Sequence, residues 1–104
     1  MQTQTSTKSF TYGFVLVEDF SLLPMTSAIE AMRMANQILG FKAYSWYTIT
    51  LNGAPVKASD NISISADFDF TSSFNQFDTI FVCAGINVIK QANAKLVQFL
   101  TRIE

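Results

Sequence analysis

The sequence predicts an α/β domain built on a mainly parallel sheet, and three observations support this prediction. Two short apolar runs, Phe14–Val17 and Thr79–Cys83, are rich in β-branched and aromatic residues. Such runs are typical of strands that are buried on both faces of a parallel sheet. A helical pattern follows the first run directly, which is the strand–turn–helix order of a parallel crossover unit. Because open sheets of this class bind ligands at the carboxyl ends of their strands, the turn Glu18–Leu23 is the first candidate for function.

The composition limits the classes of function that this chain can serve. Its 104 residues are 49% apolar and include ten Phe, enough for the core of one domain. Seven basic side chains against eight acidic ones give a net charge of -1, so we expect no surface for nucleic acid or for an anionic membrane. No apolar stretch approaches the roughly 18 residues of a membrane span.

The cysteine and histidine content bounds the chemistry. A single cysteine, Cys83, excludes an internal disulfide and is compatible with the cytoplasmic location that we expect. Histidine is absent, which removes Ser-His and Cys-His pairs and the commonest metal ligand. The sequence therefore predicts no metal site and no cofactor.

The first half of the chain predicts a tail, a strand and a helix. Residues 1–9 are polar and are expected to form a disordered tail, so that the domain itself covers 10–104. Phe10–Val17 is the first strand. The helix is expected to begin with Pro24 at its first position and to end at Gly40, a glycine suited to the left-handed conformation. Its expected buried face follows the helical period: Met25, Ala28, Ile29, Met32, Ala35 and Leu39.

A second strand and a hairpin are expected in the middle of the chain. Trp46–Leu51 is rich in aromatic and β-branched residues and predicts the strand. Asn52-Gly53 is a strong turn signal. Two short arms, Val56–Ala58 and Ile62–Ser65, predict an antiparallel hairpin attached to the sheet or lying at its margin.

The last third of the chain is less regular. Asp67–Phe77 holds four Phe without a clean period; a loop or short helix with aromatic anchors is favoured over a ligand-stacking segment. Thr79–Cys83 predicts the second buried parallel strand. A helix is expected from Asn93, as N-cap, to Glu104. Since a crossover helix normally leads to another strand, the chain is expected to end in mid-fold.

Three residues invite a chemical role, and each also has an ordinary structural explanation. Cys83 could be a nucleophile, but it lies at the end of a predicted buried strand and has no basic neighbour in sequence. This position favours an inert, structural thiol. Glu30 stands three residues before Arg33, as in a common exposed ion pair. Gly85 is either a tight turn or a place where backbone N–H groups meet an anion. The pattern around it is not GxGxxG, so a dinucleotide site is not indicated.

Three segments together resemble a known family: GFVLVEDFSLLPMTSAIEAMRMAN, LNGAPVKASDNISISAD and FDTIFVCAG. They are similar to the N-terminal domain of GlxA-family transcriptional regulators, which are AraC-type proteins. Their sensor domain resembles ThiJ/PfpI proteins and class I glutamine amidotransferases. The resemblance covers about residues 10–104 and implies a flavodoxin-like three-layer α/β sandwich, of which this chain is the N-terminal half. In the family the domain continues for about as long again, and a helix-turn-helix domain follows.

The resemblance also implies site residues. In the enzyme relatives a glutamate on the first helix contacts a nucleophilic cysteine at a later elbow, and Glu30 matches that glutamate in position and context. Relatives carry a Gly-Gly pair after the strand; here it is Ala84-Gly85, so that only Gly85 carries over. The elbow lies beyond Glu104, and Cys83 is not its cysteine. The predicted ligand-binding residues are Glu30, Ala84, Gly85, Ile86 and Asn87, with no catalytic residue.

The implied function is that of a non-catalytic, effector-sensing domain of a transcription regulator. Its effector is expected to be a small molecule, with a nitrogenous metabolite as the class that the resemblance implies, and DNA is expected to be bound only through a domain outside this chain. Two alternatives stay open: a fragment of a ThiJ/PfpI-type cysteine hydrolase, amidase or glyoxalase-like enzyme, and a stand-alone interaction module. Self-association is expected, either along the open edge of Thr79–Cys83 or through the last helix.

Overall fold

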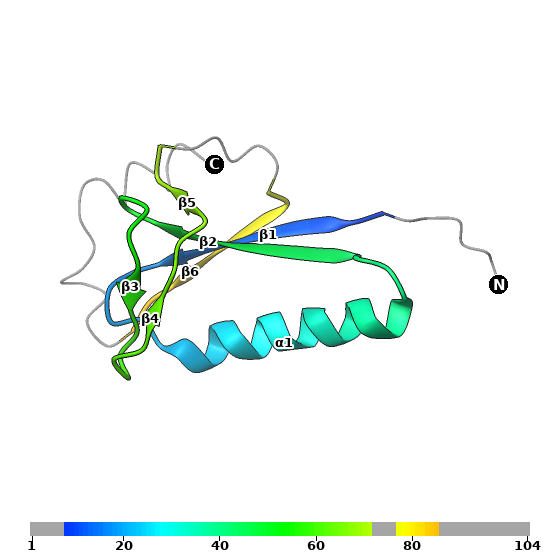
Figure 1. The fold of residues 1–104 in the computed structure, drawn as a ribbon, viewed down its shortest axis with the longest axis horizontal. Coiled ribbons are helices and arrows are strands. Elements are labelled where there is room, and N and C mark those ends of the chain that lie inside the picture. The colour runs from blue at the N-terminus through cyan, green and yellow to red at the C-terminus, as the bar shows by residue number, and fades with distance from the viewer. Residues whose placement is uncertain (1–7, 72–76, 86–104) are drawn as a thin grey trace.

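A computed structural model describes residues 8–71 and 77–85 (Figure 1). Most of the predicted tail, the predicted helix Asn93–Glu104 and the site residues Ile86 and Asn87 lie outside this part. The elements, in chain order, are β1 (Phe10–Leu16), α1 (Leu22–Leu39), β2 (Tyr44–Thr50), β3 (Val56–Lys57), β4 (Ser63–Ile64), β5 (Phe68–Asp69) and β6 (Thr79–Cys83).

Four strands form a parallel sheet in the order β5-β2-β1-β6 (Figure 1). β1 lies between β2 and β6 and pairs in parallel with both, and β2 pairs in parallel with β5. This confirms the α/β class with a mainly parallel sheet and the parallel placement of the two apolar runs. The carboxyl ends of β1 and β6 therefore lie at the same edge, next to the start of α1.

The helix α1 begins two residues earlier than the sequence predicts. Ser21 is the N-cap with extended backbone, although its side chain makes no capping hydrogen bond, and Leu22 is the first helical residue. Pro24 is the third helical residue rather than the first. It is tolerated there because the N–H groups of the first turn have no partner within a helix. At the other end, Gly40 adopts the left-handed conformation (φ 82°) and donates its N–H to the Asn36 carbonyl, as predicted.

One face of α1 packs on the sheet largely as the helical period predicts. Met25 is buried, and Ala28, Ile29, Met32 and Ala35 are half-buried. Leu39 is exposed, which contradicts its predicted place on the buried face. It is the last residue of the helix, so no further turn of α1 continues the contact beyond it.

The predicted hairpin is present as β3 and β4, which pair antiparallel and form a separate small sheet. An isolated parallel bridge between Phe20 and Ala58 connects it to the turn that follows β1. The hairpin thus lies against the end of the domain where α1 begins (Figure 1). The turn before it contains Gly53 in the left-handed region (φ 79°), in agreement with the Asn52-Gly53 signal.

Two expectations about strands are wrong. The segment Asp67–Phe77 was expected to be a loop or short helix, but its residues Phe68 and Asp69 form β5. Asp67 prepares this pairing, because its side chain accepts a hydrogen bond from the Thr48 N–H (2.9 Å) and its own N–H donates to the Thr48 carbonyl (2.9 Å). The strand β6 was expected to be buried on both faces, yet its residues are half-buried or exposed. Its only strand partner in the described part is β1.

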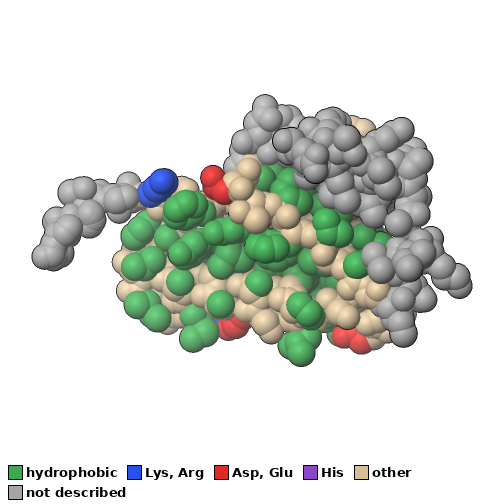
Figure 2. All heavy atoms as spheres, turned by 180° about the vertical axis from the view of Figure 1, so that it is seen from behind, with side chains coloured by type: hydrophobic (Ala, Val, Ile, Leu, Met, Phe, Trp, Pro, Cys, Tyr) green, Lys and Arg blue, Asp and Glu red, His purple; other side chains and the backbone are tan. Residues whose placement is uncertain are grey.

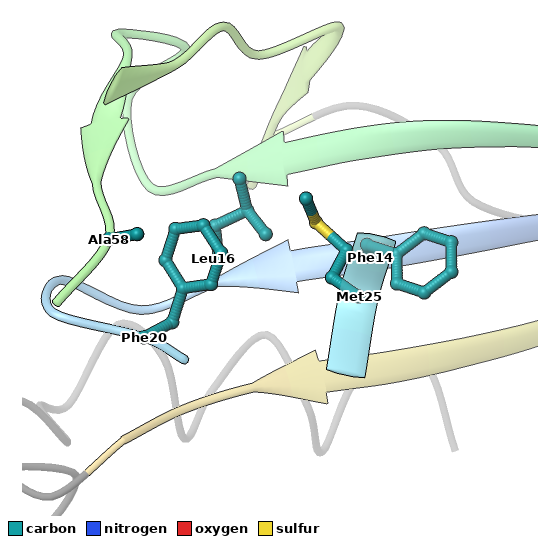
Figure 3. Packing of buried hydrophobic residues seen from close by; sticks show 5 residues of the cluster. All are labelled: Phe14, Leu16, Phe20, Met25 and Ala58. Carbon is teal, nitrogen blue, oxygen red and sulfur yellow. The ribbon is translucent and has the colours of Figure 1, made fainter. Parts of the chain in front are cut away.

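The core lies on both faces of β1, whose side chains alternate between them. On the face away from α1, Val15, Val17 and Ile49 form one cluster. On the face toward α1 and the hairpin, a second cluster joins the strand, the turn, the helix and the hairpin (Figure 3). Its buried members are Phe14, Leu16, Phe20, Met25 and Ala58. This second cluster fixes the turn between β1 and α1, where the candidate site lies.

Candidate functional site at the carboxyl ends of β1 and β6

The β1–α1 turn, residues 17–21, is held by backbone hydrogen bonds from two sides. On the β6 side, the N–H groups of Val17 and Ser21 donate to the carbonyls of Cys83 (3.0 Å) and Ala84 (3.1 Å). On the hairpin side, the Asp19 N–H donates to the Lys57 carbonyl (2.9 Å). The turn is therefore a fixed part of the sheet edge, although it contains a residue with positive φ, Asp19 (66°).

Gly85 is needed where it stands because the β1–α1 turn passes directly beside it. A Cβ atom added at this position would collide with the carbonyl oxygen of Asp19 and lie 3.4 Å from the Cα of Phe20. Only a glycine lets the two backbones approach this closely. The structure thus gives Gly85 a packing reason that does not depend on a ligand.

An apolar hollow of about 350 Å³ opens beside this turn, between the start of α1 and the end of β6. We call it the α1–β6 hollow. Its wall is built from β1, the β1–α1 turn, the first turns of α1 and the end of β6. The lining residues are Phe14, Ser21, Pro24, Met25, Ala28, Phe81, Val82, Cys83 and Ala84. Its volume lies at the lower end of the range for small-molecule sites.

The wall of the α1–β6 hollow carries no charged side chain. The polar side-chain atoms are the Ser21 hydroxyl and the Cys83 thiol. Burial raises the pKa of Cys83 to about 11, so the thiol is protonated near neutral pH and is a poor nucleophile. This agrees with the interpretation of Cys83 as an inert side chain, although it is half-buried rather than fully buried. The hollow suits the apolar part of a small molecule.

Glu30 lies away from this hollow. Its carboxylate forms an exposed ion pair and hydrogen bond with Arg33 on the same helix. The hydrogen bond from Arg33 lowers the pKa of Glu30, and the positive charge acts in the same direction. Glu30 lines a shallow depression on the outer side of α1 together with Thr26, Ser27, Ala31 and Met34.

The predicted site residues are therefore not gathered in one place. Ala84 lines the α1–β6 hollow, Gly85 packs against the β1–α1 turn beside it, and Glu30 is on the outer side of α1. Ile86 and Asn87 lie outside the described residues. Sequence reasoning missed Phe81, Met25 and Ala28 as lining residues. For the last two the only signal was the apolar face of the helix, which does not distinguish a hollow from a closed core.

Within residues 8–71 and 77–85, no group of three or more His, Cys, Asp and Glu side chains could hold a metal ion. In the same part of the chain, no helix has the length and apolar character needed to cross a membrane.

Solved structures with the same arrangement define the class of fold. An AraC family transcriptional regulator from Pseudomonas putida superposes with a TM-score of 0.73 at 21% identity, over 89% of this chain and 57% of that one. A DJ-1 superfamily protein from Agrobacterium tumefaciens gives a TM-score of 0.62 at 17% identity, over 89% of this chain and 47% of that one. At these identities the likeness concerns the fold alone, which is the DJ-1-like α/β fold.

Sequence relatives give the family. GbdR, an HTH-type transcriptional regulator of Pseudomonas aeruginosa, is 38% identical over 88 residues, 85% of this chain and 24% of that protein. CdhR of the same species is 30% identical over 89% of this chain and 27% of its own length. GlxA of Rhizobium meliloti is 36% identical over 70% of this chain and 22% of its own length. No protein-family model matches the chain.

These matches confirm the resemblance found in the sequence: the chain belongs with the GlxA-type regulators of the AraC family. It spans about a quarter of the length of the curated relatives that it matches.

Proposed function

We propose that this chain is part of the effector-sensing domain of a transcription regulator. The observation that carries the proposal is the α1–β6 hollow, which opens at the carboxyl ends of two neighbouring parallel strands in a homologue of HTH-type regulators. Open α/β sheets bind ligands at this edge. DNA binding belongs to a domain outside this chain, because a net charge of -1 offers no basic surface for phosphates. As a regulator of transcription, the protein acts in the cytoplasm.

The proposed effector is a small molecule, with a nitrogenous metabolite as the class that the family resemblance implies. The uncharged, apolar wall of the α1–β6 hollow favours contact with the apolar part of the effector. A charged or strongly polar part of the effector requires contacts outside this wall. Glu30, Ala84, Gly85, Ile86 and Asn87 remain our predicted contacts, with Glu30 reached from the outer side of α1. The carboxylate of Glu30 is exposed and would offer a negative charge to a cationic group of the effector.

We propose further that the chain is not catalytic. The alternative, a fragment of a ThiJ/PfpI-type enzyme, is not favoured by relatives that are named as transcriptional regulators. Within this chain, the Cys83 thiol is a poor nucleophile, because burial raises its pKa to about 11. An amidase, peptidase or glyoxalase activity of this chain that is lost in Cys83→Ser would overturn the proposal.

The test uses the regulator that carries this segment and a reporter gene under its control. Small nitrogenous compounds are screened for induction, and the best inducer is titrated against variants. Ala28→Leu narrows the α1–β6 hollow from the helix side, so we expect at least a tenfold higher inducer concentration for half-maximal response. Ala54→Leu is the matched control, because Ala54 is exposed in the turn before the hairpin.

Glu30→Gln tests the second part of the predicted site. A weaker response in Glu30→Gln, with unchanged thermal stability, supports its role as an effector contact. An unchanged response in both Ala28→Leu and Glu30→Gln would refute the proposed site. If no small molecule alters expression in the parent protein, the sensing function itself is wrong.

A further inference from the structure

Ser21 carries a hydroxyl that makes no capping hydrogen bond, although Ser21 is the N-cap of α1. Its backbone is extended (φ -78°, ψ 121°), as in an ordinary N-cap. At this position a serine normally accepts a hydrogen bond from the backbone N–H two or three residues later. The second of these residues is Pro24, which has no backbone N–H. The sequence therefore removes one of the two usual partners of the Ser21 hydroxyl.

The position of Ser21 is fixed by its backbone rather than by its side chain. Its N–H donates to the carbonyl of Ala84 (3.1 Å), which ties the start of α1 to the end of β6. Both residues line the α1–β6 hollow. Phe14 and Met25, which line it as well, are buried members of the cluster in Figure 3. A hydroxyl without a capping role thus stands at a fixed place on an otherwise apolar wall.

The hydroxyl of Ser21 is the strongest hydrogen-bonding side-chain group of this wall. The other polar side chain there is Cys83, whose thiol is protonated near neutral pH and is a weak donor and a weak acceptor. Charge is also scarce on the face that Figure 2 shows, where apolar side chains cover the middle and the few charged ones lie near the margins. A polar group of a molecule in the hollow therefore depends on Ser21.

We propose that Ser21 determines the specificity of the α1–β6 hollow, by donating a hydrogen bond from its hydroxyl to an uncharged carbonyl oxygen of the effector. This inference rests on the proposed function, because it concerns the same hollow. An uncharged acceptor fits better than a carboxylate, since the wall has no positive side chain to compensate a buried negative charge. The effector class is a compact apolar group that carries a carbonyl oxygen, as in a carboxamide.

A serine that only capped the helix would reveal itself in stability. Replacing a capping serine by alanine normally destabilises the helix. Because the Ser21 hydroxyl makes no capping bond, Ser21→Ala should leave the melting temperature of the protein unchanged. A clear drop in melting temperature would show that the hydroxyl caps α1 in solution and is not free for an effector, which would overturn the proposal.

The binding test uses two compounds of the same shape, cyclohexanecarboxamide and cyclohexanecarbothioamide. The sulfur of the thioamide is a much weaker hydrogen-bond acceptor than the carbonyl oxygen. Each is titrated by saturation-transfer NMR into the regulator that carries this segment. We expect the carboxamide to bind more tightly, and Ser21→Ala to raise its dissociation constant about tenfold, as the loss of one hydrogen bond allows. Ser63→Ala is the matched control, since Ser63 is an exposed serine of the hairpin.

Pro24→Ala tests the reason why the hydroxyl is free. It restores a backbone N–H three residues after Ser21, so the hydroxyl can return to capping and should bind the carboxamide less well. Adding Ser21→Ala to this variant should then have little further effect on the dissociation constant. Because Pro24 also lines the hollow, the thioamide serves as the reference for any loss of apolar contact.

The possible failures are distinguishable. Equal affinities for the two compounds, or an unchanged carboxamide affinity in Ser21→Ala, would overturn the role of Ser21. Binding that is lost in Ala28→Leu in the same experiment would still support the hollow as a site, so that the proposed function survives. If neither compound binds, the inferred effector class is wrong, while the sensing function is judged separately by the reporter screen.

Discussion

The neighbouring strands β1 and β6 resemble each other in sequence but differ in burial. They pair in parallel so that Phe14 faces Phe81 and Val15 faces Val82, which matches identical residue types across the ladder. Phe14 and Val15 are 2% and 0% exposed, whereas Phe81 and Val82 are 45% and 43% exposed. Position in the sheet accounts for the difference. β1 has a strand on each side and α1 on one face, whereas β6 has one strand partner in the described part.

The apolar run of β6 therefore predicts a parallel strand better than it predicts burial. The hydrophobic composition of a strand limits how much apolar surface it can bury, and the position of the strand in the sheet determines how much it does bury. For β6, the α1 side of the strand borders the α1–β6 hollow instead of a helix. Phe81 is nevertheless packed on one side, because its ring stacks on that of Phe14 at a centroid distance of 5.4 Å.

The matched phenylalanines give the largest expected effect. Phe14→Ala should lower the free energy of unfolding by about 3–5 kcal/mol, as is typical for a fully buried phenylalanine. Phe81→Ala should cost about 1–2 kcal/mol, because its ring keeps nearly half its surface in water. Urea unfolding followed by circular dichroism measures both.

A double-mutant cycle sharpens this comparison. Because the two rings are stacked, the combined change should cost less than the sum of the single changes. If Phe81→Ala proves as costly as Phe14→Ala, then β6 is buried in solution and the contrast between the strands fails.

The parts of the fold that local pattern determines were predictable. β1, α1, the hairpin and the left-handed Gly40 each follow from residues that are adjacent in sequence or one helical turn apart. The short strand β5 was missed because two residues carry no period, and its pairing depends on β2, some twenty residues earlier. The helix start was missed by two residues, since Ser21 caps α1 through its backbone conformation and not through its side chain.

The candidate site was predictable to a smaller extent. The edge of the sheet was correct, because the carboxyl ends of β1 and β6 do lie together, and Ala84 lines the α1–β6 hollow there. The place of Glu30 relative to this edge could not be read from the sequence. It depends on which side of α1 faces the sheet at that residue, and Glu30 is on the outer side.

Substitution of the glycines that follow β6 and α1, Gly85 and Gly40, gives the next largest expected loss of stability. Gly85→Ala should lower the free energy of unfolding by about 1–3 kcal/mol, because the new Cβ collides with the Asp19 carbonyl and forces the β1–α1 turn to move. Gly40→Ala should cost about 1 kcal/mol, since only the left-handed backbone opposes it and no atom lies within 4 Å of its Cβ.

Substitution by asparagine distinguishes the cost of a left-handed backbone at Gly40 from the cost of a steric clash at Gly85. Gly40→Asn should recover part of the loss, because asparagine tolerates the left-handed region. Gly85→Asn should be no better than Gly85→Ala, because any Cβ meets the same carbonyl. Recovery at Gly85 as well would show that the turn is free to move and is not held against β6.

Titration of Cys83 gives the smallest expected effect on the free energy of unfolding. It tests whether the last residue of β6 is shielded from water although the residue before it is exposed. It faces Leu16 in the ladder and is half-buried, in contrast to the exposed Val82 before it. Burial raises the pKa of its thiol to about 11 in the folded chain. Above pH 9 the unfolded chain therefore releases a proton that the folded chain keeps, so stability should fall slightly as pH rises from about 9 to 11. The loss is small because part of the thiol remains in contact with water. Comparison of the parent chain with Cys83→Ser isolates the effect of the thiol from the titration of tyrosine and lysine. The slope of stability against pH should be shallower in the variant.

Alkylation provides a second measurement on the Cys83 sulfur. As Cys83 is the single cysteine of the chain, iodoacetamide at pH 8 should label the folded protein at least tenfold more slowly than the chain unfolded in urea. Equal labelling rates would mean that β6 is open to water as far as its last residue and that the α1–β6 hollow has no covered end.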